Sequence, residues 1–347
     1  MIKGEKRVSI RDLADRMGVS PTAISLALND SPRISEEMRE KIKFTAKRMN
    51  YYRNSLVDTI INGTSNEIGI IVSRLSERFQ GDMCDHLIDS AYDAGFFCML
   101  YSHHLEAERE KEFIQSGIEK RLAGFIIFPT RDQANDENLW QLKEMGIPFV
   151  LMDTTMPGLA CNCVISNDRE GALRMTSHLL ELGHRQILHV SGDLGQFSAR
   201  ERIAGFNNAL KSSGINVSPG MIFNFSYKSK EMELLRGSLK KHIERFKPTA
   251  IFCGSDHIAE FVSRMLSDME LKVPGDVSIA GYGRVEDYIM GNIRLTTVDQ
   301  NIEQMSASAI EILTKDIAAK RKGKPVNKGV VRTLKTEIFE GESCRKV

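Results

Sequence analysis

The chain has 347 residues, of which 41% are hydrophobic and 27% charged, and its formal net charge is +1. This composition is normal for a soluble globular protein, and the length is too great for one ordinary domain. The sequence also excludes a protein with membrane-spanning helices, because no apolar run reaches the roughly 20 residues that such a helix needs. The charged segment Met1–Arg7 is not followed by the apolar stretch of a signal peptide, so we expect a cytoplasmic protein.

The charges are distributed unevenly along the chain. Residues 1–62 carry 12 Lys and Arg against 8 Asp and Glu, whereas the remainder carries 35 against 38. A basic bias at one end is typical of a module that faces a polyanion such as DNA.

Three short helices are expected in this basic segment. The first runs from Ser9, with Asp12 completing a capping box, to about Met17, and Gly18 ends it. The second opens with Ser20 as N-cap and Pro21 in the first turn, and the third runs from Ser35 to about Asn50. Apolar residues at helical spacing should face inward: Ile10, Leu13, Ala14, Met17; Ile24, Ala27, Leu28; Met38, Ile42, Thr45, Ala46, Met49.

The first two helices, separated by a glycine turn, have the pattern of a helix-turn-helix. A recognition helix must enter a major groove about 12 Å wide and present hydrogen-bonding side chains near its N-terminus. Thr22, Ser25 and Asn29 satisfy that need. The alternative is a plain three-helix cap on another domain.

From Glu67 onward the pattern changes to buried strands alternating with helices. Short apolar runs are expected as strands at 68–72, 96–101, 124–129, 149–153, 187–191, 250–253 and 277–281. Helices are expected between them, at 81–94, 106–116, 170–182, 200–212 and 258–269. This alternation predicts a doubly wound α/β architecture, and about ten strands are too many for one sheet, so we expect two lobes.

No enzyme signature stands out in this segment. There is no G-x-S-x-G, no P-loop and no G-x-G-x-x-G after a strand, so we predict no catalytic residues and no cofactor. We interpret His103 and His104 as solvated loop residues in preference to a metal site. The C-x-C pair Cys161 and Cys163 lacks a second ligand pair, which favours reduced thiols over zinc.

Polar side chains that follow the expected strands are candidates for a ligand site. Open α/β sheets bind ligands at the carboxyl ends of their strands. Each such residue alone is interpreted as a helix cap or a surface charge, but together they would line one cleft between two lobes: Arg74, Phe79, Asp153, Arg202, Ser255, Asp256, Arg284 and Gln300.

The N-terminal segment resembles the head of the LacI/GalR family of bacterial repressors. The matching runs are Val8–Ala14, Gly18–Pro21, Ile24-Ser25, Ala27–Asn29 and Arg33–Ser35. The resemblance implies base reading by Pro21, Thr22 and Leu26. It also implies that five residues contact the phosphate backbone or orient the side chains that do: Ser20, Ser25, Asn29, Arg33 and Ser35. Ser9 is expected on the same DNA-facing surface.

Leu26 departs from the family pattern, in which an arginine is usual. An arginine makes a bidentate contact to guanine, whereas leucine offers only apolar contact, for example to a thymine methyl group. We therefore expect an operator whose outer half-site differs from the family's usual one.

The next segment resembles the family's hinge, a short helix that folds on DNA and pushes an apolar wedge into the minor groove. Asn54 matches the family's asparagine, and Ile60 occupies the wedge position. Asp58 is unexpected, since phosphates would repel it. The alternative is a flexible linker that never orders.

The remainder resembles the family's sensor domain, which is similar to periplasmic sugar-binding proteins. The matching runs are Gly183–Ile187, Arg200–Arg202 with Gly205-Phe206, Val273–Ile279 and Leu295–Gln300. The resemblance implies that Arg202 holds polar groups of the ligand and that Asp153, Ser255, Asp256 and Gln300 match other pocket positions.

The pocket departs from the family at Gly283 and Arg284, where two aspartates are usual. If Arg284 points inward, the cleft would hold it together with Arg202 and favour an anion such as a sugar acid or sugar phosphate. If it points outward, the pocket would bind a different neutral sugar.

The expected organisation is a helix-turn-helix head at 1–53, a hinge at 54–66 and a two-lobed α/β sensor domain at 67–347. The N-lobe would comprise about 67–165 and 295–324, and the C-lobe about 166–293 and 325–347, with crossings near Ile165, Arg294 and Lys324. The family dimerises by side-by-side packing of sensor lobes. The end Glu340–Val347 lacks the leucine heptads of tetrameric members, so we expect a homodimer.

The resulting expectation is a ligand-responsive regulator, most often a repressor of carbohydrate-related genes, that binds a palindromic DNA operator as a dimer. Its effector would be a sugar, sugar acid or sugar phosphate. A second hypothesis is a sensor of the same fold with lost or altered DNA binding, and a third is an enzyme, for which no constellation is found. Response to a phosphocarrier protein is a variant of the first.

Overall fold

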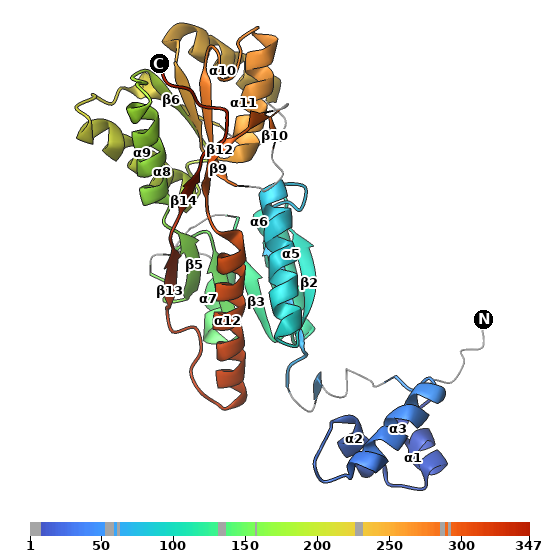
Figure 1. The fold of residues 1–347 in the computed structure, drawn as a ribbon. Helices are drawn as coiled ribbons and strands as arrows, with labels where there is room; N and C mark the ends of the chain where they lie inside the picture. Colours follow the sequence, from blue (N-terminus) through green and yellow to red (C-terminus); the bar gives the residue numbers. More distant parts are fainter. Residues whose placement is uncertain are drawn as a thin grey trace. The chain divides into compact units, whose positions relative to one another are not determined.

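The computed structural model describes residues 8–52, 59–60, 63–130, 137–156, 158–225, 232–284, 289–290 and 293–347. The chain divides into two compact units, Met1–Ser65 and Asn66–Val347, which are considered separately (Figure 1). None of the helices in these ranges combines the length and the apolar character that a membrane span requires.

The first unit contains a head of three helices, α1 (Ile10–Met17), α2 (Pro21–Leu28) and α3 (Glu36–Arg48). Each helix begins at a serine whose side chain accepts a hydrogen bond from the backbone N–H three residues later, from Asp12, Ala23 and Met38 respectively. The side chain of Asp12 in turn accepts a hydrogen bond from the backbone N–H of Ser9, which completes the capping box. Gly18 ends α1 with φ of 67°, a left-handed conformation that favours glycine. The predicted start and stop signals are confirmed.

The core of the head is formed by one apolar stripe from each helix. Its buried members are Leu13, Ala14, Ile24, Ala27, Ile42 and Ala46. Met38, at the same helical spacing in the first turn of α3, is 36% exposed. In the hinge segment Thr59 and Ile60 are helical, and Ile60 is 69% exposed. Asn54 and Asp58 lie outside the described residues.

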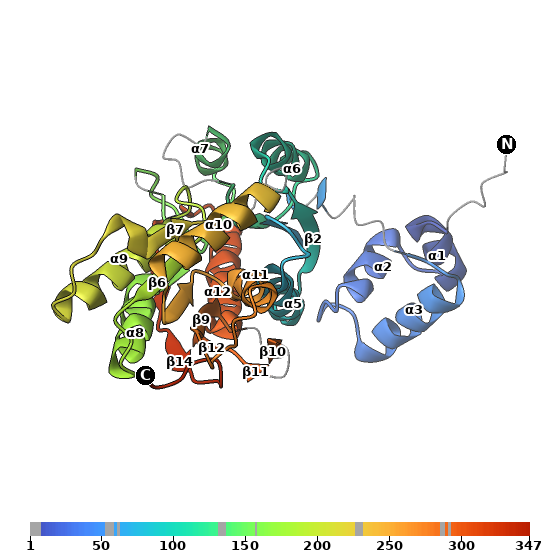
Figure 2. The same cartoon turned by 90° about the horizontal axis from the view of Figure 1, so that it is seen from above.

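The N-lobe of the α/β domain is a six-stranded parallel sheet, ordered β13-β5-β4-β3-β1-β2. Its strands are β1 (Glu67–Val72), β2 (Phe97–Ser102), β3 (Gly124–Ile127), β4 (Phe149–Met152), β5 (Asn162–Ser166) and β13 (Val331–Leu334). One face packs against α5 (Arg78–Asp93) and α12 (Ile302–Arg321), and the other against α6 (Ala107–Glu119) and α7 (Glu137–Glu144), as Figure 2 shows from above. Strands covered on both faces explain the continuous apolar runs.

The C-lobe repeats this plan with sheet order β14-β12-β9-β8-β6-β7. Its strands are β6 (Ile187–Ser191), β7 (Ile222–Asn224), β8 (Ala250–Cys253), β9 (Ser278–Gly283), β12 (Thr296–Asp299) and the antiparallel edge strand β14 (Glu337–Phe339). One face carries α8 (Asp168–Glu181) and α9 (Phe197–Ser212), and the other α10 (Met232–Phe246) and α11 (Asp256–Asp268). A 3-10 turn (Pro219–Met221) and a hairpin of β10 (Ile289–Met290) with β11 (Ile293–Arg294) complete the lobe.

The chain crosses between the lobes later than two of the three predicted positions. The segment 295–324 was assigned to the N-lobe, but β12 pairs with β9 in the C-lobe sheet, so the crossing comes at Gln300–Asn301, just before α12. The segment 325–347 was assigned to the C-lobe, but β13 pairs with β5 in the N-lobe sheet, so the last crossing comes at Lys335–Thr336. The apolar sequence of a buried strand is the same kind of pattern in either sheet. Only the strand with which it forms hydrogen bonds decides which lobe it joins.

Candidate functional site

A cleft with a volume of about 410 Å³ lies between the two lobes of the α/β domain. The loops that follow the carboxyl ends of the parallel strands form its walls, as expected for an open α/β sheet. The N-lobe wall consists of Ser73, Ser76, Glu77, Arg78, Phe79, Gln80, Leu105 and Asp153. The C-lobe wall consists of Gly192, Gln196, Ser198, Ala199, Arg202, Gly254, Ser255, Asp256, His257, Ile258, Glu260, Tyr282 and Gly283, and Gln300 lies at the crossing.

Three helices begin at this cleft: α5, α9 and α11 each contribute first-turn residues to its walls. Their unsatisfied N–H groups and positive dipole ends favour ligand oxygen atoms there. Ser255 caps α11, since its Oγ accepts from the N–H of Ile258 at 3.2 Å. The cleft therefore offers backbone polarity as well as side chains.

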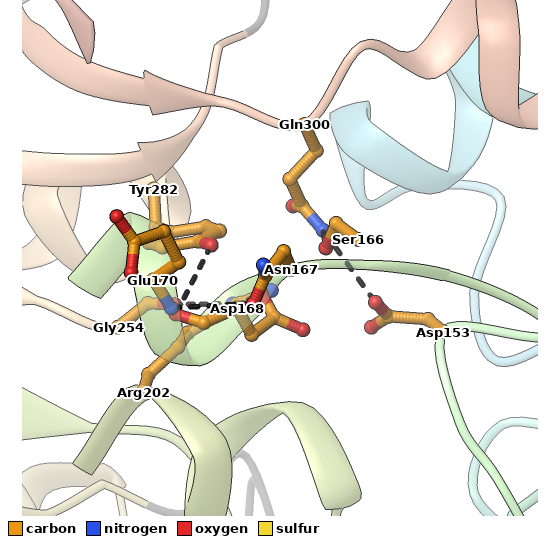
Figure 3. A network of polar contacts seen from close by, with 9 residues as sticks. All are labelled: Asp153, Ser166, Asn167, Asp168, Glu170, Arg202, Gly254, Tyr282 and Gln300. Atoms are coloured by element: carbon orange, nitrogen blue, oxygen red, sulfur yellow. Dashed lines mark hydrogen bonds and ion pairs between the residues drawn. The ribbon is translucent and has the colours of Figure 1, made fainter. Parts of the chain in front are cut away.

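Arg202 is the buried cation of the C-lobe wall, only 7% exposed (Figure 3). Its Nε donates to Asp168 Oδ1 at 2.9 Å, its Nη1 donates to the Gly254 carbonyl at 2.6 Å, and its guanidinium lies 3.8 Å from the Tyr282 ring centre. Burial alone would lower the pKa of Arg202, but the nearby acidic groups Asp168, Tyr282 and Asp153 together outweigh burial and raise that pKa, so the group stays charged. These contacts fix the guanidinium fork in one orientation at the cleft wall.

Asp153 is the half-buried acid of the N-lobe wall. Burial, followed by the nearby charge of Asp168, raises the pKa of Asp153 to about 7. The residue follows β4 with φ of 57°, a left-handed conformation that few non-glycine residues adopt and that is also found at ligand-binding sites. Gln300 joins it to the crossing: its Nε2 donates to Ser166 Oγ at 3.0 Å and lies 3.5 Å from Asp153 Oδ1 (Figure 3).

Asp256 supplies a second carboxylate from the N-terminus of α11. Its Oδ1 accepts from Thr297 Oγ1 at 2.6 Å, which ties α11 to β12. A Cβ atom on Gly281 would lie 2.3 Å from that same oxygen, so the approach of Asp256 to β9 requires glycine at position 281.

Six of the eight predicted cleft residues lie in the cleft walls: Phe79, Asp153, Arg202, Ser255, Asp256 and Gln300. Arg74 does not, because the wall after β1 is formed by its neighbours Ser73 and Ser76. Arg284 does not either. Its Nη1 donates to Asp299 Oδ2 at 2.6 Å and its guanidinium lies 4.5 Å from the Phe339 ring centre, outside the cleft. The inward-pointing alternative is corrected, because Asp299 offers this cation an ion pair elsewhere.

Sequence reasoning did not identify several residues of the site. Asp168, in the first turn of α8, forms an ion pair with Arg202, and the ring of Tyr282, near the end of β9, stacks on the Arg202 guanidinium. Gln80 and Leu105 line the N-lobe wall. The position of Leu105 just after an expected strand was an available signal, whereas nothing local marks Asp168 as the partner of a residue 34 positions away.

Two further predictions concern histidine and cysteine. His103 is fully buried, not solvated, because both ring nitrogens are hydrogen-bonded inside the N-lobe. Cys161 and Cys163 are buried free thiols with their sulfur atoms 3.8 Å apart. Within the described ranges no three His, Cys, Asp or Glu side chains are grouped so as to hold a metal ion.

The head presents the candidate DNA-facing residues on its surface. Ser25 and Leu26 are half-buried, and the remaining members are exposed: Ser9, Ser20, Pro21, Thr22, Asn29, Arg33 and Ser35. Several of them lie at or near the N-terminus of α2, where a recognition helix would present side chains to bases. Ser9, Ser20 and Ser35 also cap the three helices, so their hydroxyl groups have a structural role independent of DNA.

The fold and the cleft define a two-domain protein that combines a helix-turn-helix head with a two-lobed binding domain. Residues 9–54 match the model of bacterial regulatory proteins of the lacI family, and residues 176–344 match the periplasmic binding protein-like domain. The chain therefore combines a LacI-type helix-turn-helix domain with a periplasmic binding protein-like domain.

Curated relatives and solved structures agree with this assignment. The chain is 28% identical over 320 residues to the HTH-type transcriptional regulator DegA of Bacillus subtilis (strain 168), covering 92% of this chain and 94% of DegA. It is 27% identical over 318 residues to the HTH-type transcriptional repressor PurR of Aliivibrio salmonicida (strain LFI1238), covering 90% and 93%. Its fold is similar to the Lac repressor dimer bound to operator and the anti-inducer ONPF, with a TM-score of 0.82, 21% identity and coverage of 98% and 100%. It is also similar to the CelR–cellobiose complex, with a TM-score of 0.70, 21% identity and coverage of 97% and 100%.

Proposed function

We propose that this protein is a ligand-responsive, sequence-specific DNA-binding repressor that binds a palindromic operator as a homodimer in the cytoplasm. The observation that carries the proposal is the presence, in one chain, of a capped helix-turn-helix head and a polar cleft whose walls come from both lobes. A ligand that contacts both walls changes the relative stability of open and closed lobes. Coupling of that kind typically amounts to about 1–3 kcal/mol and is reciprocal between ligand and DNA.

The effector that the cleft favours is a neutral polyhydroxylated molecule of the sugar class. Among the described residues, four acidic side chains line the cleft: Glu77, Asp153, Asp256 and Glu260. The lining cations are Arg78 and Arg202, and Arg202 is already paired with Asp168. Carboxylates accept hydrogen bonds from hydroxyl groups and repel ligand anions. With Arg284 outside the cleft, the support for a sugar acid or sugar phosphate is weaker than the sequence indicated.

The dimer is supported by an apolar edge of the N-lobe. Strand β2 is the edge strand of its sheet, and Tyr92, Phe97 and Leu100 at this edge are 70%, 59% and 39% exposed. Exposed edge strands and clustered apolar side chains are usually covered by a partner. A second copy of the chain packed side by side at this edge would cover both the edge strand and the exposed apolar side chains.

Genomic footprinting of the purified full-length protein tests the proposal. It is run alone and with a panel of neutral sugars, sugar acids, sugar phosphates and nucleobases. The expected result is discrete palindromic sites whose occupancy changes with one neutral sugar. Absence of any site above non-specific background, under every condition, would favour the second hypothesis of a sensor that no longer reads DNA, for which Leu26 is the main support.

Leu26→Arg serves as the matched variant for DNA reading. In a selection from a random DNA pool, the natural chain is expected to prefer an apolar contact such as a thymine methyl at the position facing Leu26. The variant should prefer guanine there by about 1–3 kcal/mol, because arginine donates two hydrogen bonds to that base. Recovery of guanine by the natural chain would contradict the role assigned to Leu26.

A further inference from the structure

A second, smaller cavity of about 60 Å³ adjoins the cleft on the N-lobe side. It shares Ser73, Gln80, Leu105, Asp153, Gln196 and Ser198 with the main cleft, so the two spaces lie next to each other. Two of its apolar walls are Leu105, from the loop after β2, and Phe128 with Pro129, from the loop after β3; Met152 at the end of β4 and Phe197 at the start of α9 complete the apolar lining. At roughly 15 Å³ per water-sized group, it has room for about four such groups. We call it the side cavity.

The buried ring of His103 connects the two loops that form these walls. Its Nδ1 is hydrogen-bonded to the backbone N–H of Leu105 at 3.1 Å, and its Nε2 to the carbonyl of Phe128 at 2.9 Å. Since the Leu105 N–H can only donate, Nδ1 must accept. The ring is therefore neutral, with its proton on Nε2, which donates to Phe128. Burial lowers the pKa of His103 and so favours the same neutral form.

The loop that His103 holds is strained. His104 and Leu105 have φ of 51° and 64°, two consecutive left-handed residues of which neither is glycine. Such conformations persist only where the surroundings enforce them. The bonds that enforce this one are His104 N–H to the Ser73 carbonyl at 2.8 Å, Glu106 N–H to the His103 carbonyl at 2.8 Å, and the ring bond to Leu105.

Glu110, a buried residue of α6, stabilises the loop after β3, which forms the opposite wall of the side cavity. Its Oε2 accepts from the backbone N–H of Thr130 at 2.6 Å and lies 3.7 Å from His103 Nε2. The loop after β3 is therefore held on both sides of Pro129, at Phe128 by His103 and at Thr130 by Glu110. Because its ring bridges both walls, His103 fixes the distance between them.

We infer that His103 is a positioning residue of the effector site, which holds Leu105 and Phe128 as the walls of the side cavity, and that this cavity receives one small substituent of the effector. A group of the size and polarity of the hydroxymethyl arm of a hexose fits a space with apolar walls and with Asp153, Ser198 and Gln80 beside it. This inference rests on the proposed function, because it names the part of the cleft that distinguishes between effectors.

Hydrogen exchange at the Leu105 amide tests the positioning role without any ligand. His103→Ala removes both bonds and should speed exchange at Leu105 at least tenfold. His103→Gln, which keeps a donor near the Nε2 position but no acceptor near Nδ1, should do the same. His103→Asn, which keeps an acceptor near the Nδ1 position, should restore protection. His104→Asn is the matched control from the same dipeptide and should leave exchange unchanged. Unchanged protection in both His103→Ala and His103→Gln would overturn the positioning role.

Calorimetric titration with D-glucose and D-xylose, which differ by one hydroxymethyl group, tests the side cavity. The natural protein should bind glucose at least tenfold more tightly than xylose. Leu105→Ala opens one wall and should reduce that ratio at least threefold, as should His103→Ala, and His103→Asn should partly restore it. If His103→Ala fails to fold, Leu105→Ala and His103→Asn still decide.

The outcomes separate this inference from the proposed function. A glucose-to-xylose ratio that Leu105→Ala leaves unchanged would overturn the assignment of the side cavity. Binding of neither sugar to the natural protein would contradict both the proposed sugar class and the hydroxymethyl assignment, and the exchange measurement would then decide on His103 alone.

Discussion

In the head, each helix is capped by a serine within three residues of the N–H that it satisfies, whereas the cleft of the α/β domain is assembled from residues as far apart as Ser73 and Gln300. The head has a small core of one stripe per helix, and the α/β domain has four clusters, one on each face of two sheets. Local signals thus account for the head, and long-range pairing accounts for the cleft.

The two regions also differ in their buried polar groups. The head core contains only apolar side chains, while the α/β domain buries Arg202, Asp168, His103 and His189. All eight histidines of the chain lie beyond residue 65. Changes in charge should therefore destabilise the α/β domain selectively, and backbone changes in α1 should destabilise the head selectively. The single tryptophan, Trp140 in α7, gives a fluorescence signal for the α/β domain alone.

The largest expected effect is that of Arg202→Ala. Removing the cation leaves the buried Asp168 carboxylate without its partner, which should lower the free energy of unfolding of the α/β domain by about 3–5 kcal/mol. Urea unfolding followed by Trp140 fluorescence measures it. The double variant Arg202→Met with Asp168→Asn is the control and should lose less. A loss below about 1 kcal/mol for Arg202→Ala would show that the pair is not buried in solution.

Acidification should destabilise the α/β domain next most strongly, through His189. Burial lowers the pKa of this ring to about 4 from an ordinary value of 6.5. As the pH falls below 6.5, the unfolded chain takes up a proton that the folded chain does not, so stability is lost between pH 6.5 and 4. The loss by pH 4 is about 3 kcal/mol.

Urea unfolding of His189→Gln across the same pH range provides the control. The glutamine side chain does not titrate, so the acid sensitivity of the variant should be smaller than that of the natural protein by the contribution of His189. Equal acid sensitivity in both proteins would assign the effect to other groups.

Effector affinity should depend on pH through Asp153, whose pKa burial raises to about 7. In the free protein this raised pKa means that stability falls as the pH rises from the ordinary value of 3.8, where the unfolded chain ionises, to about 7, where the folded carboxyl ionises as well. A hydroxyl donor from the effector prefers the ionised form, so binding should weaken about tenfold from pH 8 to pH 6. Calorimetric titration measures the profile. Asp153→Asn should flatten it, and an unchanged slope in that variant would contradict the assignment.

The smallest effect is expected for Gly18→Ala in the head. Gly18 has φ of 67° and no atom within 4 Å of the position that a Cβ would take, so the cost is confined to the backbone and should be about 1 kcal/mol. Hydrogen exchange in α1 should quicken while the unfolding midpoint of Trp140 stays fixed. Gly18→Asn, which tolerates this conformation better, should cost less. A change in the Trp140 midpoint would mean that the two regions do not unfold independently.

Much of the architecture could be predicted from the sequence, because its signals are short in range. Ser9, Ser20 and Ser35 begin their helices as expected, and the apolar runs became strands, which are buried except for the half-exposed edge strand β2. Prediction missed α7, α10 and α12, and it assigned the segments that contain β12 and β13 to the wrong lobes. An apolar run shows that a strand is buried, but nothing in it identifies the neighbouring strand.

The candidate site shows the same division. Phe79, Asp153, Arg202, Ser255, Asp256 and Gln300 could be placed near the cleft because strand ends converge there in any open α/β sheet. Arg284 could not be placed, because its direction depends on the ion pair with Asp299 and on the ring of Phe339.

The sequence by itself determined the caps of the head, the alternation of strands and helices, and the strand ends from which a cleft would be built. Each of these depends on neighbours within a few residues. Only the tertiary structure decided that Asp168 pairs with Arg202, that Arg284 lies outside the cleft, and that His103 is buried between two loops. These outcomes depend on contacts between distant segments, and such contacts exist only once the sheets have formed.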